Sequence, residues 1–237
     1  MATRSTDKPT AGALPRPAST LPASGAAPAL DPRLLSELAG PRWEQSWNLL
    51  PTLTTPAADP GARQRLWTLA TMLRPHVRDA FALSEQRTAL DLRCGEGWLA
   101  HQLLSWGARH VVALDDRPES LRRARLLREH FAIGAAELEL REEHEPAPPG
   151  AAERFDVVLL TGALDRASDP ATLARAFEAT ASICAIECAG AEANTVAEAA
   201  LEAGFASVDR PLPPLQGAPA YVVEDRDLLI ARVRIGR

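Results

Sequence analysis

The segment with the strongest chemical signal runs from Ala89 to Ala100, where an apolar stretch leads into two glycines, Gly95 and Gly97. A glycine lets the backbone approach a ligand closely because it carries no Cβ. A helix that begins directly after such a turn presents free N–H groups and the positive end of its dipole. The segment therefore predicts a strand, a tight turn and a helix that together hold a ligand with a negatively charged group.

The charged residues in front of this turn separate two kinds of ligand. Taken alone, Gly95-x-Gly97-x-x-Ala100 satisfies the dinucleotide fingerprint, which accepts alanine at its third position. A dinucleotide-binding strand, however, has apolar core-facing residues two and four positions before the first glycine, where Arg93 and Asp91 stand here. In the alternative, Asp91 ends the strand beside the ligand and opens the turn. The two charges therefore disfavour a nicotinamide-dependent oxidoreductase.

At this turn the sequence resembles the class I S-adenosylmethionine-dependent methyltransferases, and the resemblance extends from about Arg87 to the C-terminus. The run Val111-Val-Ala-Leu-Asp115-Asp116 looks like the second strand of that family, whose terminal acid holds the ribose diol of the cofactor. Asp115 follows Gly95 by about 20 residues, a spacing that suits a carboxylate accepting both ribose hydroxyls. The resemblance implies S-adenosylmethionine as the cofactor.

Later segments extend the resemblance. The Phe155 to Leu160 run is similar to the fourth strand of the family, and the residues from Thr161 to Arg166 are similar to the loop that faces the transferable methyl group. Asp165 and Arg166 are the catalytic candidates, at positions where many relatives have an aromatic residue and a histidine. Glu142 stands where the family commonly contacts the adenine amino group, although its charged surroundings also fit a solvated loop. The cofactor-binding candidates are Asp91, Arg93, Gly95, Gly97, Asp115, Asp116, Glu142 and Thr161.

Arg93 departs from the family pattern because it occupies the position of the first glycine. If this position requires a positive φ angle, arginine costs about 1–2 kcal/mol in backbone strain, and its side chain must leave the turn or enter the pocket. In the other interpretation Arg93 is extended and pairs with Asp91 or Asp115. Two functions therefore stay open: a methyltransferase for a small or carrier-bound acceptor, and a degenerate relative that serves as a binding or partner module.

Short apolar runs alternate with helical patterns around the turn, which predicts a parallel sheet with helices on both faces. The expected fold class is α/β, a Rossmann-like three-layer αβα sandwich with about seven strands. The predicted parallel strands are Thr88–Leu92, Val111–Leu114, Leu138–Leu140, Phe155–Leu160 and Ile183–Glu187. The predicted helices are Trp98–Trp106, Pro118–Phe131, Pro170–Thr180 and Ala193–Ala203. Phe205–Val208, Tyr221–Val223 and Leu228–Val233 predict an antiparallel edge.

Three parts are expected along the chain. Residues 1–30 are mostly Ala, Pro, Ser and Thr and predict a disordered tail; a transit peptide is the alternative, but the segment lacks an amphipathic arginine face. Residues 31–84 predict an N-terminal helical segment and a possible lid, with a helix capped by Asp31 and a longer helix over Arg63–Ala82. Residues 85–237 form the methyltransferase-like domain.

Composition narrows the function further. Of the 237 residues, 46% are hydrophobic and 24% charged, as in an ordinary globular protein. A net charge of −5 argues mildly against a nucleic-acid-binding surface. No apolar run suits a membrane span or a secretory signal, so a cytoplasmic location is expected.

The remaining candidate residues suggest structure more than chemistry. Three cysteines without CxxC spacing predict free, buried thiols, and five histidines without ligand spacing predict surface or helix-end positions and no metal site. Trp43, Trp47 and Trp67 precede the domain and are expected to pack rather than to contact the acceptor. The Trp47 to Pro56 stretch is faintly similar to transferases acting on tRNA wobble uridines, so tRNA is a weak alternative to a small-molecule acceptor.

Overall fold

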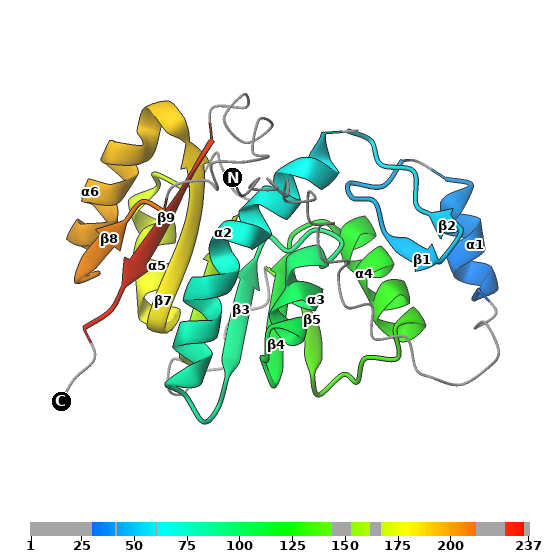
Figure 1. Ribbon diagram of the computed structural model, residues 1–237, viewed down its shortest axis with the longest axis horizontal. Helices are drawn as coiled ribbons and strands as arrows, with labels where there is room; N and C mark the ends of the chain where they lie inside the picture. Colours follow the sequence, from blue (N-terminus) through cyan, green and yellow to red (C-terminus); the bar gives the residue numbers. More distant parts are fainter. Residues whose placement is uncertain are drawn as a thin grey trace, which may run out of the picture.

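The computed structural model describes residues 30–40, 42–59, 61–143, 153–161, 167–211 and 226–234. The tail expected over residues 1–29, the strand expected at Tyr221–Val223 and the loop that carries Asp165 and Arg166 lie outside these residues. The described part of the chain is built on a seven-stranded sheet with the strand order β5-β4-β3-β6-β7-β9-β8 (Figure 1).

The sheet is mixed as expected. Its strands are β3 (Thr88–Leu92), β4 (His110–Asp115), β5 (Leu138–Glu142), β6 (Phe155–Leu160), β7 (Thr180–Ala189), β8 (Ser207–Asp209) and β9 (Arg226–Arg232). β3 pairs in parallel with β4 and β6, whereas β9 runs antiparallel to β7 and β8. β8 begins later than predicted because Phe205 is buried edge-on against Phe177, and only the chain after it pairs with β9.

Helices cover both faces of the sheet, which confirms the three-layer sandwich (Figure 1). The helices around the sheet are α2 (Ala62–Ala82), α3 (Trp98–Ser105), α4 (Pro118–His130), α5 (Pro170–Ala179) and α6 (Ala193–Ala203). α2 and α3 pack with alternate strand residues on one face, and α5 and α6 pack on the other. Successive strand residues point to opposite faces of the sheet, so Ala89 packs on the side of α2 and α3, and Leu90 packs on the side of α5 and α6.

α2 is part of this core rather than a separate unit. It continues through Pro75 to Ala82, and its buried face includes Leu73 and Val77, which belong to the same cluster as Val157 of β6. The apolar spacing that predicted the helix therefore also identifies the side that covers the sheet.

The segment before α2 is less helical than predicted. α1 (Pro32–Leu38) is capped by Asp31, whose side chain accepts a hydrogen bond from the Arg33 N–H at 2.7 Å. β1 (Asn48–Leu50) and β2 (Leu53–Thr54) then form an antiparallel ribbon, so the helical prediction for this stretch was wrong. The ribbon and α1 lie beside α4 at one end of the molecule (Figure 1). The Trp43 and Trp47 rings are buried there, which confirms the packing role expected for these two tryptophans.

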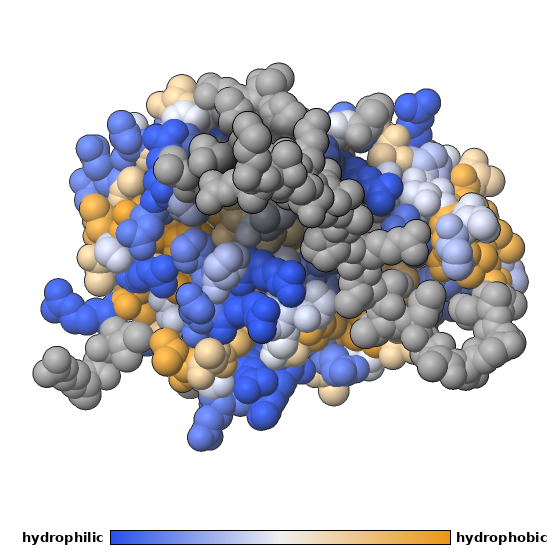
Figure 2. Space-filling model, viewed as in Figure 1, coloured by the Kyte–Doolittle hydropathy of each residue, from blue (hydrophilic) through white to orange (hydrophobic). Residues whose placement is uncertain are grey.

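The large hydrophobic side chains that are exposed in the described part of the chain are scattered. Figure 2 shows hydrophobic residues interspersed with hydrophilic ones over the coloured part of the view. The exposed large hydrophobic residues are Leu35 in α1, Leu83 after α2 and Leu201 in α6, which belong to three separate elements. Among the described helices none has the length and apolar character needed to cross a membrane.

Candidate active site

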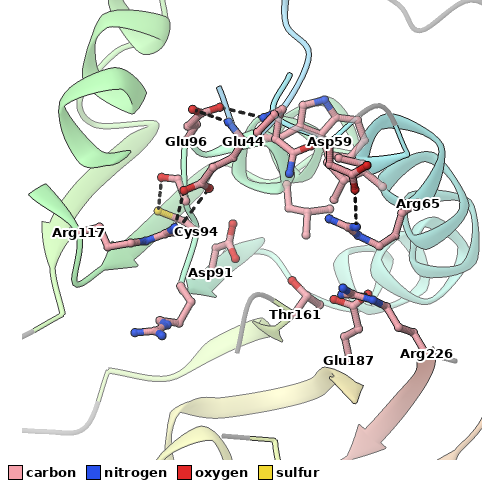
Figure 3. Close-up of a pocket in the computed structure, with 18 residues that line it drawn as sticks. Glu44, Asp59, Arg65, Asp91, Cys94, Glu96, Arg117, Thr161, Glu187 and Arg226 are labelled. Carbon is pink, nitrogen blue, oxygen red and sulfur yellow. Dashed lines mark hydrogen bonds and ion pairs between the residues drawn. The ribbon is translucent and has the colours of Figure 1, made fainter. Parts of the chain in front are cut away.

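A cavity of about 510 Å³ lies where the carboxyl ends of the central strands meet the N-terminal segment (Figure 3). The register pairs Leu92 of β3 with Leu160 of β6, and Leu160 with Ile186 of β7. The residues that follow these three positions therefore share one edge of the sheet. Among them, Arg93, Thr161 and Glu187 line the cavity, together with Glu44 and Arg65 from the opposite wall.

The glycine turn has the geometry that its sequence predicts. Gly95 and Gly97 have φ angles of 59° and 83°, which residues with a Cβ rarely adopt. Gly97 is the N-cap of α3. A Cβ on Gly95 would lie 2.6 Å from Oε2 of Glu44, so the backbone here also has a close neighbour. Both glycines are favoured by the backbone conformation, whereas the neighbour of Gly95 is the end of a flexible side chain that could shift.

Arg93 adopts the left-handed conformation, with a φ angle of 65°. Its guanidinium forms an ion pair with Asp116 and lies 3.8 Å from the Glu143 carboxylate. Of the two interpretations of Arg93, the left-handed backbone is therefore the one observed, and the extended alternative paired with Asp91 or Asp115 was wrong. The strained backbone turns the side chain across to the neighbouring turn, where Asp116 follows β4 directly.

Asp115 is fully buried at the end of β4 and accepts hydrogen bonds on both oxygens. The Gly95 N–H donates to Oδ2 at 2.7 Å, and the Arg117 N–H donates to Oδ1 at 2.9 Å. The Arg117 side chain donates as well, from Nε to Oδ1 at 2.9 Å and from Nη2 to Oδ2 at 3.1 Å. Burial alone would raise the pKa of Asp115, but the hydrogen bonds from Arg117 and Gly95 outweigh burial and hold it below its usual range.

Asp91, at the end of β3, has the opposite electrostatics. It is 1% exposed, and its Oδ2 has no hydrogen-bond partner within the described residues. Burial, together with the negative charge of Asp115, raises the pKa of Asp91 to about 8, although the N–H of Ala100 in α3 acts against this rise. The carboxyl group therefore lines the cavity with an acceptor that no described side chain uses.

Glu96, between the two glycines, anchors the N-terminal segment over the turn. Its buried carboxylate accepts hydrogen bonds from the Glu44 N–H at 3.0 Å and the Gln45 N–H at 3.2 Å, and from Arg123 at 3.1 Å. Burial raises the pKa of Glu96, and these hydrogen bonds oppose the rise. Sequence reasoning passed over Glu96, although a charged residue between two glycines of a buried turn is itself a signal.

Two further candidates lie near this edge. Thr161 is 6% exposed and lines the cavity at the end of β6. Glu142 pairs with Asp115 in the strand register but is exposed and is not among the described residues that line the cavity. Its neighbour Glu143 is the one that faces Arg93. The adenine role of Glu142 therefore stays a prediction.

The far end of the cavity carries two acid–arginine pairs that sequence reasoning did not single out. Arg226 at the start of β9 lies 3.6 Å from the Glu187 carboxylate, and Arg65 in α2 lies 3.4 Å from Asp59 (Figure 3). Glu187 is 3% exposed within a strand whose neighbours are apolar. A buried charge in an apolar strand is the signal that could have identified it.

His101 differs from its predicted surface or helix-end position. It lies within α3 and packs edge-on against Trp47 and Phe131, with ring centroids 5.0 and 5.4 Å away. Burial lowers the pKa of His101 to about 4, so the ring is neutral near pH 7. In the part of the chain that the structure describes, no three His, Cys, Asp or Glu side chains are arranged to hold a metal ion. The three cysteines are free thiols, of which Cys184 and Cys188 are buried as predicted, and Cys94 is half-buried.

The sequence matches the family described as "Methyltransferase domain" over residues 83–203, which is 121 of the 237 residues. The matched region runs from just before β3 to the end of α6 and includes the glycine turn and Asp115. The chain belongs to this family. It is a class I methyltransferase that depends on S-adenosylmethionine. No curated protein sequence gives a significant match.

Solved structures share the methyltransferase fold. The N-terminal domain of EvdMO1, crystallised in the presence of S-adenosylhomocysteine (SAH) and D-fucose, has a TM-score of 0.62 at 20% identity, covering 85% of this chain and 95% of that one. The chain spans 46% of the longer EvdMO1 structure, with 85% of this chain covered, 22% identity and a TM-score of 0.57. Magnesium protoporphyrin IX methyltransferase from Synechocystis PCC 6803 with bound SAH has a TM-score of 0.56 at 12% identity, covering 85% and 94% of the two chains.

The residues that line the cavity, together with Asp115 behind Arg117, fit S-adenosylmethionine. The buried Asp91 oxygen without a described partner suits a cationic part of the cofactor. Gly95, which carries no Cβ, lines the cavity with its backbone. Asp115 stands at the strand end where a carboxylate can accept from a ribose diol.

Proposed function

We propose that this methyltransferase transfers the methyl group of S-adenosylmethionine to a small-molecule or carrier-bound acceptor. The observation that carries the proposal is the continuity of the cavity, which joins the glycine turn to the acid–arginine pairs at its far end. The cofactor would lie over the ends of β3 and β4, and the acceptor would lie beyond Thr161. A cytoplasmic location stays a prediction, as does the alternative of a tRNA acceptor.

The residues that line the cavity, and Asp115 and Gly97 beside it, would then have distinct roles. Asp115 would hold the ribose, and Gly95 and Gly97 would let the backbone approach the methionine part of the cofactor. Asp91 would face its cationic group. Asp165 and Arg166 stay the catalytic candidates on the loop after Thr161. The bound cofactor supplies a methyl group that is already strongly electrophilic, so placing the acceptor in line with it provides much of the acceleration.

The far end of the cavity favours an acceptor rich in hydroxyl groups. Two arginines and two carboxylates there balance in charge, and each pair combines donors with acceptors. A hydroxyl that donates to Glu187 while a neighbouring oxygen accepts from Arg226 would satisfy both groups. EvdMO1, whose N-terminal domain was crystallised with D-fucose present, gives this class of small molecule a precedent within the fold.

Calorimetric titration of the purified chain tests the proposal. SAH and S-adenosylmethionine should bind, and NAD should not bind. Glu187→Gln should leave SAH binding unchanged, because the Glu187 carboxylate lies at the far end of the cavity, and should lower turnover of a hydroxylated acceptor. Binding of SAH without methyl transfer to any acceptor of a broad panel would favour the degenerate binding module instead.

A further inference from the structure

The carboxylate expected to hold the ribose is already saturated by the chain's own donors. An ionised carboxylate has about four lone-pair positions. Two of those on Asp115 are taken by the backbone N–H groups of Gly95 and Arg117. The other two, one on each oxygen, are taken by Nε and Nη2 of the Arg117 side chain.

The Arg117 guanidinium therefore imitates a ribose diol. Its edge presents two N–H donors to the two oxygens of one carboxylate, as the 2′ and 3′ hydroxyls of a ribose would. A diol can reach Asp115 only after this side chain has moved. The two backbone donors can stay in place, which leaves one free position on each oxygen.

A second contact holds the guanidinium where it is. Glu44 of the N-terminal segment forms an ion pair with Nη1 of Arg117, lies 3.4 Å from its Nη2, and accepts a hydrogen bond from Ser120 Oγ at 3.1 Å. The Glu44 carboxylate also lies against the glycine turn, since its Oε2 is 2.6 Å from the place of a Gly95 Cβ. Its backbone is fixed by Glu96. One ion pair thus covers both the ribose acid and the turn. Figure 3 shows its two residues, Glu44 and Arg117, side by side.

We propose that Glu44 and Arg117 form a clasp that closes the ribose site and competes with the ribose of S-adenosylmethionine for Asp115. The inference rests on the proposed cofactor site. Only side chains need to move, because the Glu44 backbone stays bonded to Glu96 and the Arg117 N–H stays bonded to Asp115. Both side chains reach the solvent, with 36% of Glu44 and 50% of Arg117 exposed. The released guanidinium can therefore move into water.

Three nucleoside probes separate competition for the diol from other effects of the arginine. SAH, adenosine and 2′,3′-dideoxyadenosine are titrated into the full chain and into Arg117→Ala. The variant should bind SAH and adenosine about twofold to fivefold more tightly, a change of the size expected for losing a partly exposed ion pair. It should bind dideoxyadenosine no more tightly than the wild type, because that probe has no hydroxyls with which to use the freed oxygens.

Two further variants complete the experiment. Arg117→Lys keeps the charge but not the two-donor edge, so it should show part of the gain, and it carries the test if Arg117→Ala does not fold. Arg122→Ala is the matched control. Arg122 lies on the same helix with 52% of its side chain exposed and pairs with Glu37 of α1, outside the cavity. Its removal should leave all three affinities unchanged.

The possible failures are distinct. Unchanged or weaker adenosine binding in both Arg117 variants, with SAH still bound by the wild type, would overturn the clasp and leave the cofactor site standing. An equal gain for dideoxyadenosine would also overturn it, because the arginine would then obstruct the site without competing for the diol. Absence of SAH binding in every folded variant and in the wild type would overturn both the clasp and the proposed function.

Discussion

The turns after β3 and β4 lie side by side on one sheet edge, yet the buried carboxyl groups next to them differ in hydrogen bonding and in pKa. Asp115, the last residue of β4, has donors on both oxygens and a lowered pKa. Asp91, at the end of β3, has one oxygen without a described partner and a pKa raised to about 8. Burial is almost equal, at 0% and 1% exposure. Local donors therefore decide the charge state, and burial only sets how much those donors matter.

The difference follows from which atoms each turn supplies. The β4 turn brings the Arg117 backbone and side chain back onto Asp115, whereas the first turn of α3 brings one N–H, that of Ala100, toward Asp91. Asp115 is thus satisfied before any ligand arrives, whereas Oδ2 of Asp91 has no partner among the described residues and is available to a ligand. Substitutions at four residues test this contrast.

Removing the saturated carboxylate should have the largest destabilising effect, and it should also weaken cofactor binding. Asp115→Ala leaves the Gly95 N–H without its acceptor, while the half-exposed Arg117 guanidinium keeps its ion pair with Glu44. We therefore expect a loss of about 1.5–3 kcal/mol in the free energy of unfolding and at least a tenfold rise, on the order of 1.4 kcal/mol or more, in the SAH dissociation constant. Urea denaturation and calorimetry measure the two quantities. Asp116→Ala is the control, since Asp116 is partly exposed and should cost far less. Unchanged SAH binding in Asp115→Ala would move the ribose role elsewhere.

Removing the unsatisfied carboxylate should instead stabilise the ligand-free protein. The pKa of Asp91 in the folded protein, about 8, lies well above the ordinary value of 3.8 that it has in the unfolded chain. Between these values the unfolded chain has released a proton that the folded chain still holds, so rising pH favours unfolding. The stability gain of Asp91→Asn over wild type should therefore grow from pH 4 to pH 8, by up to about 1.4 kcal/mol per pH unit. Urea denaturation at four pH values measures it.

Two results would contradict this account of Asp91. A stability difference that does not change with pH would show that the carboxyl group keeps an ordinary pKa. Tighter binding of S-adenosylmethionine by Asp91→Asn would show that the unpartnered oxygen does not face the cationic group of the cofactor.

Glu96 is a third buried carboxylate, and its hydrogen bonds hold the N-terminal segment and Arg123. Glu96→Gln keeps the shape but removes the charge that holds Arg123 and the N–H groups of Glu44 and Gln45. We expect a loss of about 1–3 kcal/mol in the free energy of unfolding, and faster hydrogen exchange at those two amides. Glu119→Gln, which removes a 57% exposed partner of the same arginine, should change stability by about 0.5 kcal/mol or less. Equal effects of the two variants would contradict the anchoring role.

Arg93 links the two turns and should show the smallest net effect. Arg93→Gly relieves a left-handed backbone but loses the ion pair with Asp116 and adds unfolded-state entropy, so the three contributions should offset to within about 1 kcal/mol. Arg93→Ala loses the ion pair and keeps the strain, so it should be less stable than Arg93→Gly by about 1 kcal/mol. The two denaturation curves measure the difference. Equal stabilities would mean that the backbone at residue 93 relaxes once the arginine is removed.

The elements nearest the site follow from short-range patterns in the chain. The strand Thr88–Leu92 is found at the predicted residues, and the helix after Gly97 ends one residue early. Alternation and turn chemistry act between residues a few positions apart, so they can be recognised without the fold. The prediction that Asp115 ends a strand at the sheet edge also rested on local sequence, namely the apolar run before it.

The partners of these residues could only be decided by the tertiary structure. Glu44 meets Arg117 across 73 positions of sequence, and Glu96 holds the Glu44 N–H across 52. Arg93 reaches Asp116 rather than Asp91 or Asp115 because its backbone adopts a positive φ angle that the residue type disfavours. The sequence alone determined which charges the site contains. The fold decided which of them neutralise one another, because ion pairing depends on distances that are established only when the sheet edge and the N-terminal segment come together.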